Sequence, residues 1–192
     1  DILQQLKRDC ILHYRTSHDN GKFGTINYAV WSDILLCPHC NAELNYWDLA
    51  MSHKQKRILD SFNCPSCGTL LEKKQCLNLF QNYFDKITGK AERIKKMVPV
   101  LYIYTYLGKR YYKTPDKADL ELVDLIDNME PTEFIARDRM PEGDESRRND
   151  KYGITHVSHF FTKRNNLVLA KLYSLIQNSN YPKRTIFLLM DI

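Results

Sequence analysis

The chain has 192 residues, of which 43% are hydrophobic and 27% charged, a composition typical of globular and not of disordered proteins. No run approaches the ~20 apolar residues of a membrane-spanning helix, and no secretory signal is present, so we expect a cytoplasmic protein without a membrane partner. Only 7 glycines occur and none builds a phosphate-binding loop, which argues against a self-sufficient nucleotide-binding enzyme. Because the first residue is Asp1, we expect a segment of a longer protein.

The first part of the chain combines helical and strand patterns. Apolar residues at three- and four-residue steps predict an amphipathic helix over residues 2–15, followed by a turn at 18–21. Alternating apolar and polar residues predict a strand over 25–36. Residues 48–60 are predicted to form a short helix, whereas helix and strand cannot be distinguished for the apolar residues 77–84.

A hairpin and a helix are predicted next. Residues 98–106 and 110–113 are rich in strand-forming side chains and flank a turn around Gly108. Thr114 is the predicted helix cap and Pro115 lies in the first turn. The predicted apolar face of this helix consists of Leu120, Val123, Leu125 and Ile126.

The last part of the chain contains one clear helix. Residues 130–159 lack periodicity and are long for a loop in a compact domain, which indicates a functional or mobile segment. Thr162 is predicted to cap a helix whose apolar residues extend to Ile176. Residues 186–190 are predicted to begin another buried element.

Four of the six cysteines form two C-x-x-C pairs, the most specific motif in the chain. Cys37 and Cys40 are separated by 23 residues from Cys64 and Cys67. Each pair turns the backbone so that two thiolates converge, and together the pairs supply four sulfurs for a tetrahedral Zn²⁺ site. Four sulfur ligands leave no open coordination position, so the predicted zinc is structural.

Other roles for these cysteines are possible. Two disulfides are one alternative, but nothing marks the chain as secreted, and intracellular thiols stay reduced. His39 or His53 could replace a cysteine as a ligand, although His39 is expected to point outward. Cys10 and Cys76 have no His or Cys at ligand spacing and are interpreted as core or incidental thiols.

The element pattern and the cysteine spacing predict an α+β fold: a zinc ribbon with β-hairpins plus flanking helices. We divide it into an N-terminal helix and turn (1–24), a zinc-ribbon and β-hairpin region (25–113), and a helical region with a long basic and acidic loop (114–192).

Charge is distributed in blocks. The net charge is zero over 1–85, +7 over 86–113, −8 over 114–145 and +6 over 146–192. Basic blocks fit a surface that faces a polyanion, but the blocks could equally neutralise one another in the fold. The candidate nucleic-acid-binding residues are Lys109, Arg110, Arg147, Arg148, Lys151, His156, His159, Lys163 and Arg164.

Tyrosines crowd the predicted basic hairpin, at positions 102, 104, 106, 111 and 112. Their rings could stack on unpaired bases. We favour the alternative that alternate tyrosines form the buried face of a sheet.

Several stretches resemble one bacterial protein family. They are residues 31–33 with the first cysteine pair, the two pairs together, 98–101, 113–116, 139–150 and 152–170, of which Tyr152–Asn165 is the most specific. Nearly the whole chain resembles the central segment of DNA methylases that carry a zinc ribbon. These enzymes use S-adenosylmethionine to methylate exocyclic amino groups of adenine or cytosine.

The resemblance has consequences for the site residues. The cofactor-binding and catalytic motifs of the methylases are absent here, so it implies that S-adenosylmethionine binds outside this segment and that no catalytic residue lies within it. The four cysteines match the family position by position. Asn41 stands where Gly is commoner, and Asn166 interrupts a usually apolar run.

The resemblance therefore implies a zinc-binding insert region of a restriction-modification-type DNA methyltransferase, not itself an enzyme. Its expected partners are DNA and the catalytic domain of the parent protein, and its expected contribution is DNA binding or target recognition. The alternative is a structural or protein-interaction module that packs on the catalytic domain. An independent hydrolase using His156 and His159 is disfavoured, because no acid or nucleophile stands at a matched spacing.

Overall fold

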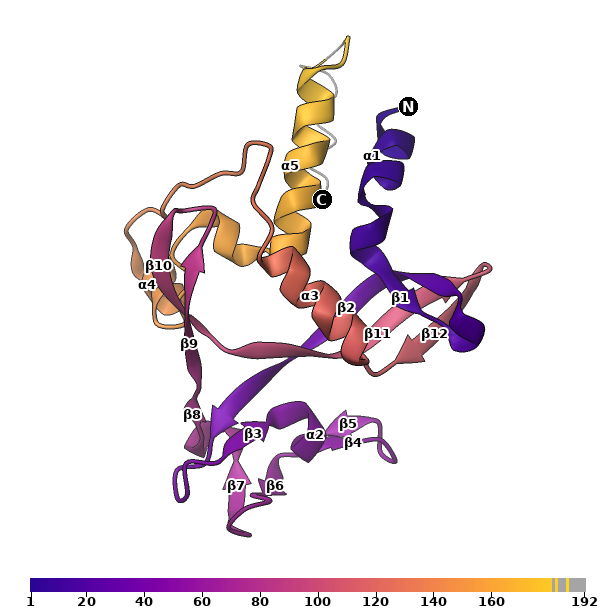
Figure 1. The fold of residues 1–192 in the computed structure, drawn as a ribbon. Coiled ribbons are helices and arrows are strands. Elements are labelled where there is room, and N and C mark those ends of the chain that lie inside the picture. The colour runs from indigo at the N-terminus through magenta and orange to yellow at the C-terminus, as the bar shows by residue number, and fades with distance from the viewer. Residues whose placement is uncertain (181, 183–185, 187–192) are drawn as a thin grey trace.

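A computed structural model describes residues 1–180, 182 and 186 and shows a mixed α and β fold with antiparallel sheets (Figure 1). The helices are α1 (Ile2–Cys10), α2 (Tyr46–Ala50), α3 (Lys117–Asp127), α4 (Asp144–Asp150) and α5 (Lys163–Gln177), with 3₁₀ turns η1 (Ile11–Tyr14), η2 (Asp19–Gly21), η3 (Lys73–Gln75) and η4 (Val157–Phe160). The strands are β1 (Arg15–Ser17), β2 (Phe23–Leu36), β3 (Glu43–Asn45), β4 (Met51–Ser52), β5 (Arg57–Ile58), β6 (Ser61–Asn63), β7 (Leu70–Glu72), β8 (Leu77–Asn78), β9 (Phe80–Asp85), β10 (Lys90–Lys95), β11 (Met97–Tyr106) and β12 (Lys109–Lys113).

The long strand β2 belongs to both parts of the molecule. Its first part lies in a sheet of order β1-β2-β11-β12, and its last part pairs with β3 and β8. Ile26 and Ile34 are buried on it, as its alternating pattern predicts. The boundary predicted between residues 24 and 25 falls inside β2, so the N-terminal region and the hairpin region share one sheet.

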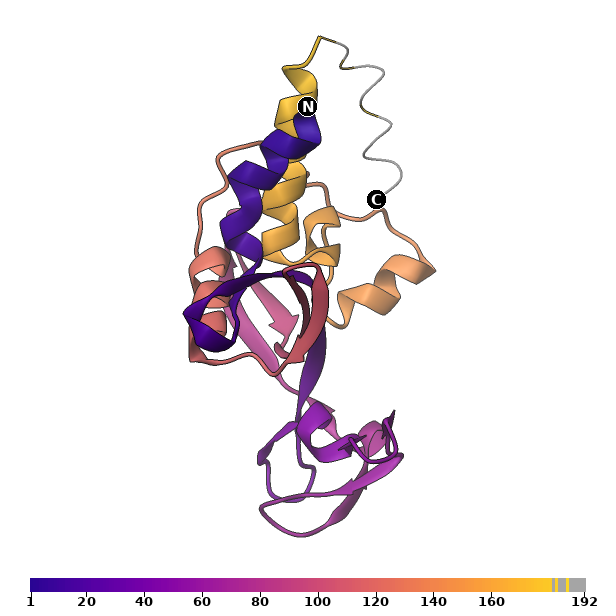
Figure 2. The ribbon, with the colours of Figure 1, turned by 90° about the vertical axis from the view of Figure 1, so that its right-hand side faces the viewer.

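Residues 34–79 form a small lobe, the cysteine lobe, at the C-terminal end of β2 (Figures 1 and 2). Its buried core consists of Leu35, Cys37, Leu44, Ala50, Phe62, Cys64 and Leu71. A unit with so few apolar side chains usually needs a disulfide or a metal for stability.

The helix predicted over 48–60 is wrong. The Asn45 side chain accepts a hydrogen bond from the Trp47 amide, so α2 begins at residue 46, and it ends at Ala50. The chain then forms the hairpin β4–β5, in which Lys56 adopts a positive φ of 52°. Residues 53–57 are all exposed, and without an apolar face they have no packing that would favour a helix.

The other helices lie in the part of the molecule away from the cysteine lobe (Figure 1). α1 and α3 both pack against α5, and the buried core there is Ile87, Ile126, Ile135, Leu167 and Ala170. The predicted face of α3 is half wrong, because Leu120 and Leu125 are 41% and 64% exposed. Asp119 takes a buried position on that helix instead.

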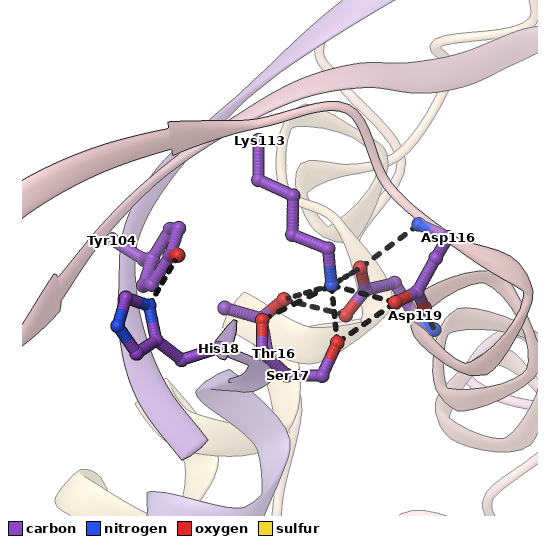
Figure 3. Close-up of polar contacts among 7 residues, drawn as sticks. All are labelled: Thr16, Ser17, His18, Tyr104, Lys113, Asp116 and Asp119. Carbon is purple, nitrogen blue, oxygen red and sulfur yellow. Dashed lines mark hydrogen bonds and ion pairs between the residues drawn. The ribbon is translucent and has the colours of Figure 1, made fainter. Parts of the chain in front are cut away.

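A polar cluster fixes the start of α3 against β1 and β12 (Figure 3). Lys113 Nζ lies 2.7 Å from Asp116 and 2.8 Å from Asp119, and the Thr16 hydroxyl donates to Asp119 at 2.7 Å. The carboxylates of Asp116 and Asp119 each accept the other's backbone amide at 3.0 Å. This capping box makes Asp116 the N-cap, so the prediction of Thr114 is wrong.

Two of the hairpin tyrosines are buried. Tyr102 and Tyr104 are 1% and 5% exposed, which confirms the predicted sheet face at these alternate positions. The Tyr104 hydroxyl lies 2.8 Å from His18 Nδ1 (Figure 3). Tyr112 points to solvent at 67% exposure.

The segment 130–159 is more ordered than a long loop. It contains α4 and η4, and it docks on β10 through a hydrogen bond from the Lys95 amide to the Tyr152 carbonyl at 3.0 Å. Thr162 accepts from the Asn165 amide and caps α5, as predicted. The element predicted to begin at 186–190 falls outside the described residues, apart from Ile186 itself.

Candidate metal centre and basic surfaces

The two cysteine pairs sit in turns of the same construction. In the first, the Asn41 amide donates to the Cys37 carbonyl at 3.0 Å, and in the second the Gly68 amide donates to the Cys64 carbonyl at 2.9 Å. Asn41 and Gly68 have φ values of 57° and 73°. Both residues therefore adopt the left-handed conformation, which Asn and Gly adopt most easily.

The four sulfurs converge on one point between these turns. The Sγ atoms of Cys37, Cys40, Cys64 and Cys67 all lie within 4.8 Å of one another. Two of the separations, Cys37 to Cys67 and Cys40 to Cys64, are 3.8 and 3.7 Å. A tetrahedral zinc with bonds of about 2.3 Å would place its sulfurs about 3.8 Å apart, whereas a disulfide needs about 2.05 Å. The cluster can therefore hold a metal ion and does not contain disulfides.

The cysteine thiols of the cluster influence one another's ionisation. Hydrogen bonds from the Thr69 hydroxyl and backbone lower the pKa of Cys67 to about 6. A backbone hydrogen bond at Ala42 lowers the pKa of Cys40, but desolvation and the neighbouring sulfurs raise it overall to about 12. Hydrogen bonds with the neighbouring sulfurs raise the pKa of Cys40 and lower that of Cys67, so the four thiols do not ionise independently. A divalent cation would favour the thiolate form of all four, because a metal binds the deprotonated sulfur.

The other thiols and histidines near the motif lie outside the cluster. Cys10 is buried on α1, and Cys76 packs against the core of the cysteine lobe. His39 and His53 are exposed, and neither contributes to the group of four ligands.

The candidate DNA-contacting residues are scattered. Lys109 and Arg110 are exposed at the tip of the β11–β12 hairpin, and Arg147 and Arg148 are exposed on α4. Figure 1 shows these elements on opposite sides of the molecule. Lys151 is exposed next to α4 and lies over the Tyr152 ring. The structure therefore does not bring the predicted cations into one surface.

Three of the candidates are interior residues. His156 and Arg164 are 8% and 9% exposed, and the side chain of His159 is 4% exposed. Lys163 is half-buried, and desolvation lowers its pKa. Burial removes the side chains of His156, His159 and Arg164 from the exposed surface.

His159 forms a buried pair with Asp85. Its Nε2 lies 3.2 Å from the carboxylate, and its Nδ1 lies 3.1 Å from the Gly153 carbonyl and 3.2 Å from the Thr155 amide. Burial alone would raise the pKa of Asp85, but hydrogen bonds from His159 and the Ile87 amide lower it to about 2. The sequence analysis did not identify Asp85 as the partner of His159, because the two residues are 74 positions apart. With both side chains buried, we interpret the pair as a link between β9 and η4.

The sequence analysis missed a second basic hairpin. Lys54, Lys56 and Arg57 are all exposed on β4–β5. They were not recognised as a basic hairpin because this segment was predicted to be a helix. Figure 1 shows β4–β5 and the tip of β11–β12 projecting toward the same side of the molecule. We name the five exposed cations Lys54, Lys56, Arg57, Lys109 and Arg110 the basic hairpin face.

Several cations elsewhere in the chain form ion pairs, whereas those of this face form none with the residues that the structure describes. Lys95, Lys96 and Lys113 each pair with a carboxylate. Within residues 1–180, none of the five cations of the basic hairpin face forms an ion pair. They are therefore available to an external anion.

Searches of protein-family models, curated proteins and solved structures give no match to this chain. In the part of the chain that the structure describes, no helix combines the length and apolar character needed to cross a membrane.

Proposed function

We propose that the chain is a zinc-ribbon module in which one structural Zn²⁺ is held by Cys37, Cys40, Cys64 and Cys67. The convergence of the four sulfurs, all within 4.8 Å, carries this proposal. The matching turns and the small core of the cysteine lobe support it, because a metal would supply the stability that so few apolar side chains cannot.

The module is proposed to bind DNA through the basic hairpin face. Its five cations are exposed, and three of them, Lys54, Lys56 and Arg57, lie in the β4–β5 hairpin of the cysteine lobe. A metal-braced lobe can hold such cations in a fixed arrangement toward phosphates.

The resemblance to DNA methylases supplies the proposed context: a segment that grips duplex DNA beside a separate catalytic domain. An enzyme that modifies a base must take it out of the stack, and contacts to the surrounding backbone hold the duplex meanwhile. S-adenosylmethionine would then bind to the catalytic domain and not to this chain.

A salt titration of binding to a fluorescent 20-base-pair duplex tests this proposal. The chain should bind at low salt, and charge reversal at Lys54, Lys56 and Arg57 together should weaken binding at least tenfold. The slope of log K against log salt should fall by about 3, since each lost phosphate contact removes about 0.9. The control is reversal of Arg147 and Arg148 on α4, which should leave the slope within about 1 of the original.

A second candidate function, docking on a partner domain, is favoured by apolar side chains on the outside of α1 and η1. Leu3, Ile11 and Leu12 are 48%, 53% and 60% exposed. If the chain fails to bind duplex DNA even at low salt, the DNA proposal is wrong and the docking function takes its place.

A further inference from the structure

A cavity of about 310 Å³ lies among β2, α3 and the start of α5, in the part of the molecule away from the cysteine lobe (Figure 1). This volume is at the lower end of the ~300–1,000 Å³ typical of small-molecule sites. Its lining includes three aromatic residues, Tyr14, Tyr28 and Trp31, and the opposite charges of Asp127 and Arg164. Rings and a few convergent polar groups are the usual composition of a ligand site.

Arg164 is the unusual member of this lining. It is only 9% exposed, and its Nε has no hydrogen-bond partner. Among the described residues, no carboxylate lies within 4.0 Å of its guanidinium. The guanidinium instead makes a cation–π contact with Tyr14, with its carbon 5.4 Å from the ring centroid. A buried cation without an ion-pair partner is unfavourable, and Asp127, which lines the same cavity, acts on this charge only from beyond 4.0 Å. The guanidinium can therefore accept an external anion.

Other groups around Arg164 strengthen this indication. The Tyr102 hydroxyl is also buried without a hydrogen-bond partner of normal geometry among the described residues. Burial raises the pKa of this hydroxyl, and the nearby Arg164 guanidinium opposes that rise. Thr162 and Asn165 extend the lining to the first turn of the 15-residue α5. The unpaired amides and the dipole of a helix start favour an anion at this position.

We propose that this cavity binds a phosphate monoester carried on a flat aromatic ring, of which a nucleoside monophosphate is the natural example. The phosphate lies against Arg164 and the start of α5, and the base stacks on the wall of Trp31 and Tyr28. The ligand is either a free nucleotide or the 5′-phosphorylated end of a strand, which share this chemistry. The site does not depend on the zinc or on the basic hairpin face.

Trp31 provides a direct readout of the site. In a Trp47→Phe variant it is the sole tryptophan, so its fluorescence can be titrated with dAMP, deoxyadenosine and inorganic phosphate. dAMP is expected to quench it with a dissociation constant at least tenfold lower than either fragment. A 5′-phosphorylated tetranucleotide and its 5′-hydroxyl counterpart then separate the two sources of the ligand.

Arg164→Met in the same background should weaken dAMP binding at least tenfold, while the melting temperature stays equal or rises because an unpaired buried charge is removed. If that variant does not fold, Arg164→Lys, which keeps the charge but loses the planar fork, should fold and still bind more weakly. Arg148→Met on α4 is the matched control and should leave quenching unchanged. The proposal is overturned if dAMP at 5 mM, roughly the upper limit of a specific site, causes no quenching, or if the Arg164 variants bind as tightly as the parent.

Discussion

Gly153 is the residue whose backbone leaves least room for a side chain. Its φ is +84°, and an added Cβ would lie 2.0 Å from the Arg93 carbonyl oxygen on β10. Gly153→Ala should therefore reduce the free energy of unfolding by at least about 2 kcal/mol, from backbone strain and loss of docking on β10. Urea denaturation measures this.

Gly21→Ala is the matched control for that substitution. Gly21 has a comparable φ of +68° but nothing within 4 Å of the added Cβ, so only the strain of about 1 kcal/mol remains. Equal losses in the two variants would show that the contact with β10 is not stabilising.

The pair of Asp85 and His159 predicts how stability depends on pH. The folded-state pKa of Asp85 is about 2, below its usual 3.8. The pair therefore stabilises the fold fully above about pH 4, and this stabilisation of about 2 kcal/mol is lost as the pH falls from 3.8 through 2. Unfolding free energies between pH 5 and pH 2 should fall less steeply for Asp85→Asn than for the parent chain. Asp60→Asn, at an exposed position, should keep the parent slope.

At the scale of elements, the start of α3 depends on Lys113. Its side chain is 18% exposed and its partner Asp119 only 3%. Burial alone would lower the pKa of Lys113, but hydrogen bonds to Asp116 and Asp119 raise it. Lys113→Met would leave the Asp119 carboxylate buried without a counter-charge, and should cost about 3 kcal/mol of stability by thermal or chemical denaturation.

The comparison for Lys113 is Lys117, in the first turn of α3 itself. Lys117 is 91% exposed and is 3.7 Å from Glu121, so Lys117→Met should cost less than about 0.5 kcal/mol. Similar losses at the two lysines would mean that the cluster in Figure 3 does not stabilise α3.

The two cysteine turns predict a selective effect of thiol removal. Cys64→Ser should release the metal and unfold the cysteine lobe, because metal binding supplies folding free energy to a site of this kind. Cys76→Ser, which changes a half-buried thiol outside the cluster, should retain it. Metal content and the near-ultraviolet signal of Trp47 in α2 report the two effects together, and equal metal content in both variants would contradict the assignment of ligands.

How far the sequence predicts each element depends on how local its causes are. Each cysteine turn is local, because the C-x-x-C pair and the Asn41 or Gly68 that follows it determine the geometry within five positions. The meeting of the two pairs is predicted from the ligand requirement of zinc, and the four sulfurs do converge. The long strand β2 and the helix cap at Thr162 also depend mainly on residues close to them in the sequence. The capping box of α3, the pairing of Asp85 with His159 across 74 positions and the burial of Arg164 all depend on tertiary contacts, which periodicity does not contain. The helix predicted over 48–60 failed because turn formation at Lys56 outweighed a weak helical pattern.

At the scale of the whole molecule, β2 connects two parts with separate cores. The core of the cysteine lobe and the core around α3 and α5 share no residue. Chelation of the metal should therefore unfold the cysteine lobe while the helical part persists, in a transition distinct from global unfolding. Hydrogen exchange before and after chelation should show loss of protection in residues 34–79 and retention in α5.

The central claim is that four thiolates of this lobe hold one zinc ion. Metal analysis and cobalt substitution of the reduced protein test it together. One zinc per chain, replaceable by Co²⁺ with the absorption of a tetrahedral tetrathiolate site and with protection of four thiols from alkylation, is the predicted result. Protein purified under reducing conditions without bound metal, and with six thiols reacting freely in the presence of added zinc, would contradict it.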